Sequence, residues 1–122
     1  MKKLKTKYFS RWARKSRLGD DQLLIASQEL AAGLFAANLG SNLYKVRIAA
    51  QSSGKSSGYR TLIAYKKGDR LLFIFGFSKN ERDNIDQKEL ESFKKLSKDY
   101  LSLSFSELER AIKMGVLTEL EQ

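Results

Sequence analysis

The 122-residue sequence contains no cysteine, no histidine and no proline. Without cysteine, the chain can form no disulfide, no thiolate metal site and no cysteine nucleophile. Without histidine, it lacks the most common general acid–base group and the most common zinc ligand. The absence of proline excludes a stiff proline-rich linker. Catalytic chemistry would therefore have to come from lysine, arginine, tyrosine, acidic or hydroxyl side chains, or from the backbone.

Long hydrophobic runs are missing as well. No apolar run approaches the roughly 20 residues that cross a bilayer, and the basic N-terminus lacks the apolar segment of a secretory signal. The composition, 42% hydrophobic and 30% charged, is typical of a globular protein. We expect one domain over residues 1–122 with its own core, a cytoplasmic location and no membrane partner.

The charge is strongly asymmetric. The chain carries a formal net charge of +9, and residues 1–60 hold twelve basic and three acidic side chains, whereas the remainder holds eleven of each. Up to Leu18 there are eight basic residues and no acidic residue. A basic surface of this kind can simply aid solubility, but it favours a polyanionic partner: RNA, DNA or an acidic protein.

The first forty residues predict helices. Residues 4–9 suggest a short extended segment, an edge strand at most, followed by a helix capped by Ser10 that runs to about residue 17. A second helix is predicted from Asp20 or Asp21 to about residue 37, ended by the run Asn-Leu-Gly at 38–40.

The pattern then changes to strands and back to helices. Strands are predicted over residues 43–49, 59–67 and 70–78, the last apolar enough to be central, with a tight turn at Gly68 and Asp69. Helices are predicted over residues 86–101 and 106–114, followed by a short tail at 116–120. This order predicts an α+β fold: a small antiparallel sheet of three to four strands, with two N-terminal helices and the C-terminal helices packed on it.

Three cations are predicted to meet on one face of the sheet. Lys45 and Arg47 are two residues apart on a strand, so they share a face, and Arg60 begins the next strand. If the two strands pair as a hairpin, the three charges converge where they could bind a phosphate and stabilise a charged transition state. The alternative is an ordinary solvated strand face.

Other features carry weaker signals. Lys55 lies in a Gly/Ser-rich loop, which could cradle a phosphate although it lacks the Walker spacing and could be a plain hairpin loop. Polar residues from Lys79 onward follow the central strand, where they could belong to a site or cap a helix. The acidic residues nearby lack the spacing of a calcium loop, so no metal is predicted. Candidate RNA contacts are Lys55, Tyr59, Lys66 and Phe77, although strand aromatics usually belong to the core.

Four segments together resemble a known superfamily: FSRWARK, LYKVRIA, GKSSGYRTLIAYKKGDRLLFIFGFSKNERDNI and LSFSELERAIKMGVLTEL. Nearly the whole chain is similar, in the same order, to toxins of the RelE/ParE superfamily, most of all to its HigB-like branch of type II toxin–antitoxin systems. The resemblance implies a microbial-ribonuclease-like α+β fold and cleavage of mRNA on the ribosome without a metal or other cofactor. It also implies neutralisation by a cognate antitoxin, often a HigA-like helix-turn-helix protein.

Carried over by position, the resemblance points to Lys45, Arg47, Arg60 and Lys79 as catalytic residues. Arg47 and Arg60 would bind the phosphate, Lys45 would act as the base, and Lys79 would act as the acid. The loop around Lys55 matches a Gly-Lys-Ser-Gly-Gly pattern except for a serine at 57. Two other functions stay open: ParE-like relatives inhibit DNA gyrase, and a basic module could bind without catalysis.

Overall fold

A computed structural model describes residues 1–49 and 58–121 of the chain. The elements run in the order β1 (Lys2–Thr6), α1 (Lys7–Lys15), α2 (Asp20–Ala31), β2 (Ala37–Gly40), β3 (Leu43–Ile48), β4 (Tyr59–Lys66), β5 (Arg70–Ser78), α3 (Gln87–Ser102), α4 (Phe105–Lys113) and β6 (Leu117–Glu119). The predicted α+β class is confirmed, as are the three long strands and the C-terminal pair of helices.

The sheet differs from the prediction in size and in strand direction. It has six strands in the order β2-β3-β4-β5-β1-β6, and β1 runs parallel to β5 while the other neighbouring pairs are antiparallel. The prediction of a wholly antiparallel sheet of three to four strands was therefore wrong. The additional strands have five residues or fewer, too few to show a clear alternation, and their partners are distant in sequence.

The first helix begins earlier than predicted. Thr6, not Ser10, is its N-cap: the Thr6 hydroxyl accepts a hydrogen bond from the backbone N–H of Phe9 at 3.1 Å. Phe9 is consequently a helical core residue rather than part of an extended segment. The early start joins β1 directly to α1, so the helix leaves the sheet without a loop.

The second helix ends earlier than predicted. It stops at Ala31, and Gly33 takes a positive φ of 84° while its N–H bonds to the carbonyl of Leu30 at 2.9 Å. A glycine in this conformation is a common helix end. Residues 37–40, predicted as the end of the helix, instead pair with β3 as an edge strand.

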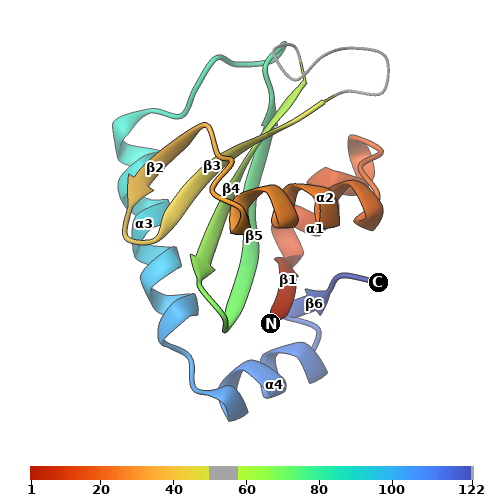
Figure 1. Cartoon of the computed structure of the whole chain (residues 1–122), viewed down its shortest axis with the longest axis vertical. Coiled ribbons are helices and arrows are strands. Elements are labelled where there is room, and N and C mark those ends of the chain that lie inside the picture. Colours follow the sequence, from red (N-terminus) through yellow and green to blue (C-terminus); the bar gives the residue numbers. More distant parts are fainter. Residues whose placement is uncertain (50–57, 122) are drawn as a thin grey trace.

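The helices form a layer on each face of the sheet, as Figure 1 shows: α1 and α2 lie on one side, and α3 lies on the other, with α4 below it. Two separate hydrophobic cores result, one beneath α1 and α2 and one beneath α3 and α4. β5 contributes to both cores and is buried along nearly its whole length, as predicted for a central strand.

A β-bulge in β5 determines which face its aromatic residues occupy. The register runs Leu62 opposite Phe75 and then Ile63 opposite Phe73, so β5 has one extra residue between these pairs. Simple alternation would place the three phenylalanines of β5 on one face. The bulge instead leaves Phe73 in the core beneath α1 and α2 and places Phe75 and Phe77 on the α3 face.

Candidate functional site

Lys45, Arg47 and Arg60 lie on the α3 face of the sheet, at the end that α3 does not reach. Arg47 and Arg60 are direct partners across the β3–β4 ladder, and Lys45 is two residues from Arg47 on the same face. Val46 and Ile48 point the other way into the core beneath α1 and α2. We call these three residues the cationic cluster; alternation along β3 and the β3–β4 register bring them together.

The three cations differ in exposure. Arg47 is exposed, Lys45 is half-buried, and Arg60 is buried with 6% of its surface accessible. Burial lowers the pKa of Lys45, and the positive charges of Arg47 and Arg60 lower it further. Burial and Arg47 likewise lower the pKa of Arg60. Arg47 is therefore the most accessible charge, and Lys45 is the amine that most readily loses its proton.

A second group of side chains continues from the cluster along β5. Phe77 is the ladder partner of Arg60, and the guanidinium carbon of Arg82 lies 5.6 Å from the centre of the Phe77 ring. Arg82 forms a two-pronged ion pair with Glu89, one contact being 3.1 Å, and hydrogen-bonds the carbonyl of Asn84. Sequence reasoning gave Arg82 no role. Its place just after the central strand was a signal that it could lie beside the site.

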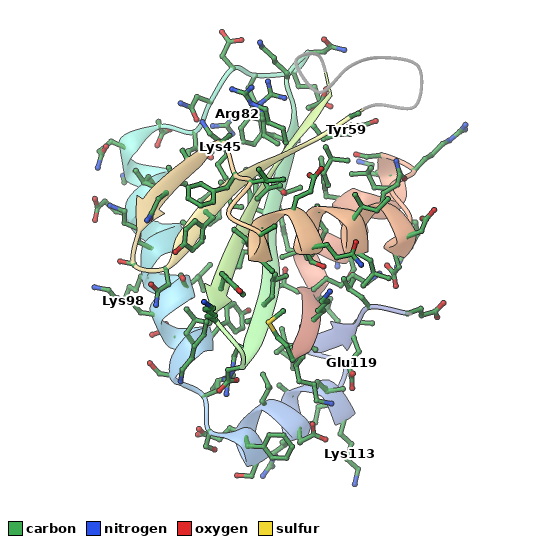
Figure 2. All side chains as sticks on the ribbon, in the orientation of Figure 1. Lys45, Tyr59, Arg82, Lys98, Lys113 and Glu119 are labelled. Atoms are coloured by element: carbon green, nitrogen blue, oxygen red, sulfur yellow. The ribbon has the colours of Figure 1, made fainter. Side chains whose placement is uncertain are left out.

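Figure 2 shows Lys45 and Arg82 toward the same end of the sheet, whereas Lys98, Lys113 and Glu119 lie toward the other end. Lys79, predicted as the acid, follows β5 at the end where the cluster lies; it is exposed, and its backbone N–H bonds to the carbonyl of Gly58 at 3.2 Å. The structure places this residue near the cluster in the fold, and its chemical role stays a prediction.

Two predicted RNA contacts, Lys66 and Tyr59, do not join the cluster in the structure. Lys66 lies at the opposite end of β4 beside the Gly68 turn, 3.9 Å from Asp69. Tyr59 faces the α1 side, where its ring packs edge-on against Trp12 at 5.6 Å and its hydroxyl donates to the carbonyl of Ser16. Lys55 lies outside the described residues. The fourth, Phe77, borders the cluster but is buried, with 3% of its surface accessible.

Two further observations concern cofactors and membranes. In the described parts of the chain, no three acidic side chains gather into a group that could hold a metal ion. Across residues 1–49 and 58–121, every helix is too short or too polar to span a bilayer. The cluster offers positive charge, which suits a phosphate-bearing ligand.

The sequence was also compared with known proteins. Residues 1–120 match a family described as the RelE toxin of the RelE / RelB toxin-antitoxin system. The matched range spans all the helices and strands described above. No curated protein matches the chain.

Proposed function

Because the chain belongs to the RelE family of toxins from toxin–antitoxin systems, we propose that it cleaves mRNA on the ribosome and that the cationic cluster holds the scissile phosphate. RelE toxins are generally endoribonucleases, and each pairs with an antitoxin. We further place the chain, as a single cytoplasmic toxin domain over residues 1–122, in the HigB-like branch. That placement depends on the sequence resemblance described above.

The direct pairing of Arg47 with Arg60 is the observation that supports this proposal most. Like charges opposite each other across a ladder destabilise a sheet. With Lys45 beside them, the three side chains concentrate positive charge on one face of the sheet. A bound phosphate would be attracted to this concentrated positive charge and would reduce the repulsion between the cations.

The proposed reaction needs no group beyond the protein and the RNA. The 2′-oxygen attacks the adjacent phosphorus in line, the new O2′–P bond forms, and the bond from phosphorus to the 5′-oxygen breaks. The neutral amine of Lys45 accepts the 2′-OH proton, and the ammonium group of Lys79 donates a proton to the departing 5′-oxygen. The products are a 2′,3′-cyclic phosphate and a free 5′-hydroxyl.

Each cation has a distinct task in this proposal. Arg47, the exposed arginine, contacts the non-bridging phosphate oxygens and stabilises the charge that develops in the transition state. Arg60, which is buried, strengthens the positive potential at the phosphate and lowers the pKa of Lys45. Arg82 and Phe77 form the wall next to the cluster.

The test is to replace Arg47 and Arg60 singly with alanine and to map cuts in mRNA on translating ribosomes by primer extension. We expect Arg47→Ala to lower the cleavage rate by about 10²–10³-fold, as for the loss of one transition-state donor. Arg60→Ala should lower the rate as well, because it removes positive potential beside the phosphate. Lys66→Ala is the matched control, since Lys66 is an exposed cation at the other end of β4; it should cleave normally.

Two results would contradict the proposal. Full cleavage by folded Arg47→Ala and Arg60→Ala proteins would show that the cluster is not the site. Growth arrest with intact mRNA and DNA-damage signalling would instead support a ParE-like action on DNA gyrase.

The partner we propose is a small helix-turn-helix antitoxin of the HigA type. Its gene is expected beside that of the toxin, because toxin and antitoxin must be produced together. Co-expression of the neighbouring reading frame should restore growth; failure to do so would contradict the HigA-like assignment without affecting the ribonuclease assignment.

A further inference from the structure

A groove lies on the α3 face between the start of α1 and the side of α3. Its volume is about 530 Å³, and its lining, which is mostly apolar, includes Lys7, Tyr8, Phe75, Phe93, Leu96 and Val116. We call it the Tyr8 groove. Glu89 also lines it, and Glu89 holds Arg82, which lies over Phe77. The groove therefore borders the side chains that adjoin the cationic cluster.

A row of aromatic rings connects the cluster to the groove. Phe77 lies opposite Arg60 in the sheet, the Phe77 and Phe75 ring centres are 6.2 Å apart, and Phe75 stacks with Tyr8 at 5.7 Å. The ring planes of Tyr8 and Phe75 are 19° apart. Phe75 is buried, whereas 60% of the Tyr8 surface is exposed. Stacking on Phe75 therefore fixes the Tyr8 ring, which is exposed to solvent.

The charges around the groove favour an anionic ligand. Lys7 lines it and is exposed, and the first eighteen residues of the chain contain no acidic side chain. The acidic residue that lines it, Glu89, is neutralised by Arg82, with a hydrogen bond that lowers the pKa of Glu89 from 4.5 to about 2. A nucleotide combines the two properties that this groove accommodates, a flat ring and a negative charge.

We propose that the Tyr8 groove is a nucleotide subsite, in which a base next to the scissile phosphate stacks on Tyr8 and its phosphate meets Lys7. This inference rests on the proposed function, because the cluster must hold the phosphate that fixes the position of the strand. It adds a separate role: the cluster binds the reacting phosphate, and the Tyr8 groove positions the neighbouring nucleotide. Stacking of this kind tolerates different bases, so the subsite would add affinity more than sequence preference.

An acidic amphipathic segment of the antitoxin is the other ligand that such a groove could take. Two observations favour the nucleotide: the most exposed apolar side chain that lines the groove is a stacked aromatic ring, and the groove lies on the face that carries the cationic cluster. Removal of the Tyr8 ring or of the Lys7 charge would change the affinities for RNA and for the antitoxin differently. One set of variants therefore separates the two ligands.

The experiment measures binding of a fluorescently labelled, uncleavable 2′-O-methyl hexaribonucleotide to the full chain by anisotropy at several salt concentrations. We expect Tyr8→Leu, which keeps an apolar side chain, to weaken binding by at least about fivefold, in line with the loss of one stacked base. Tyr8→Phe should bind within about twofold of the parent, because stacking needs the ring and not the hydroxyl. Lys7→Gln should lower the slope of log affinity against log salt by about 0.7 for one lost phosphate contact to a single strand.

Phe105→Leu is the matched control, since Phe105 is an exposed aromatic residue at the start of α4, 67% accessible; its affinity should stay unchanged. Equal affinities for the parent and Tyr8→Leu, or no binding of the hexanucleotide by the parent, would overturn the subsite. Unchanged RNA binding with loss of antitoxin binding would assign the groove to the antitoxin instead. In each case, primer extension on ribosomes separately decides whether the chain is a ribonuclease.

Discussion

Lys45 is the residue whose chemistry depends most on its neighbours. Burial, Arg47 and Arg60 all lower its pKa, which raises the fraction of neutral amine available to accept a proton. Since only the neutral form can act as a base, the cleavage rate should rise with pH up to this pKa, which lies below the ordinary value of 10.5.

The prediction is that Arg47→Gln raises the pKa of Lys45, because one of the two repelling charges is removed. NMR titration of lysine labelled at the ε-carbon would detect the shift directly, without a cleavage assay. An unchanged Lys45 titration in Arg47→Gln would show that the two charges do not interact. Lys45→Arg is a second check on the base, since arginine does not lose its proton and should abolish cleavage.

At Gly76 of β5, the Trp12 side chain of α1 lies so close to the sheet that it would clash with any side chain at this position. A Cβ atom at this position would lie 2.2 Å from Cζ3 of Trp12, and the Trp12 ring also packs against Phe9 and Tyr59. We expect Gly76→Ala to lower the free energy of unfolding by about 1–3 kcal/mol through overpacking, as measured by denaturant titration.

The control for Gly76 is a double-mutant cycle with Trp12→Leu. Because the smaller side chain leaves room for the methyl group, the two substitutions together should be less destabilising than the sum of the separate effects. Strict additivity would mean that the Trp12 ring does not limit this position.

Residue patterns predicted the cationic cluster better than the other site residues. Lys45, Arg47 and Arg60 were placed together because alternation on a strand and pairing of successive strands are local rules. Phe77 could not be assigned to a face, because the bulge near Ile74 changes the alternation of β5 and leaves no mark in composition. Tyr59 precedes Arg60 on β4, so regular alternation places it on the opposite face from the cluster. Tyr8 and Arg82 approach the site only through tertiary packing.

Among the elements, α3 depends on charged contacts at its first turn. Asp86 accepts a hydrogen bond from the backbone N–H of Glu89 at 2.8 Å, and Glu89 accepts one from the backbone N–H of Asp86 at 3.1 Å. Together with the Arg82 pair, these contacts lower the pKa of Glu89 from 4.5 to about 2. Its contribution to stability is present above pH 4.5 and is lost as the pH falls toward 2.

The prediction compares the melting temperature of the parent protein with that of Glu89→Gln as a function of pH. The parent should be more stable near neutral pH, and the difference should shrink between pH 4.5 and about 2, where Glu89 becomes protonated. Glu91→Gln, on the same helix but without an arginine partner in the described structure, is the control. A difference that persists unchanged at pH 2 would show that the charge of Glu89 does not support α3.

For helices and strands, patterns among neighbouring residues predicted the element correctly, whereas pairing between distant segments was missed. The apolar run over residues 70–78 led to the correct central strand, because its evidence lies within a few residues. β2 and β6 were missed because short strands are stabilised by partners far along the chain. The start of α1 was misplaced because both Ser10 and Thr6 are cap-forming residue types, and serine is the more favoured of the two.

For the molecule as a whole, β6 joins the two ends of the chain. It pairs with β1, with Leu117 opposite Thr6, and both Leu117 and Leu120 are buried. We expect Leu117→Ala to lower the free energy of unfolding by about 2–5 kcal/mol, the usual range for a buried leucine. The control is Leu34→Ala at a residue 64% exposed, which should change stability by less than about 0.5 kcal/mol. Similar losses in the two variants would mean that β6 is not part of the cooperative core.

The position of β1 has a consequence for the order in which the protein can be made. This strand precedes both of its neighbours in the chain: β5 lies on one side of it and β6 on the other, the latter more than one hundred residues downstream. A nascent chain released before α3 would lack Phe93 and Glu89, and one without β6 would leave an edge of β1 open. A product interrupted before α3 would therefore still carry the three cations of β3 and β4, but its core beneath α3 and α4 would be incomplete.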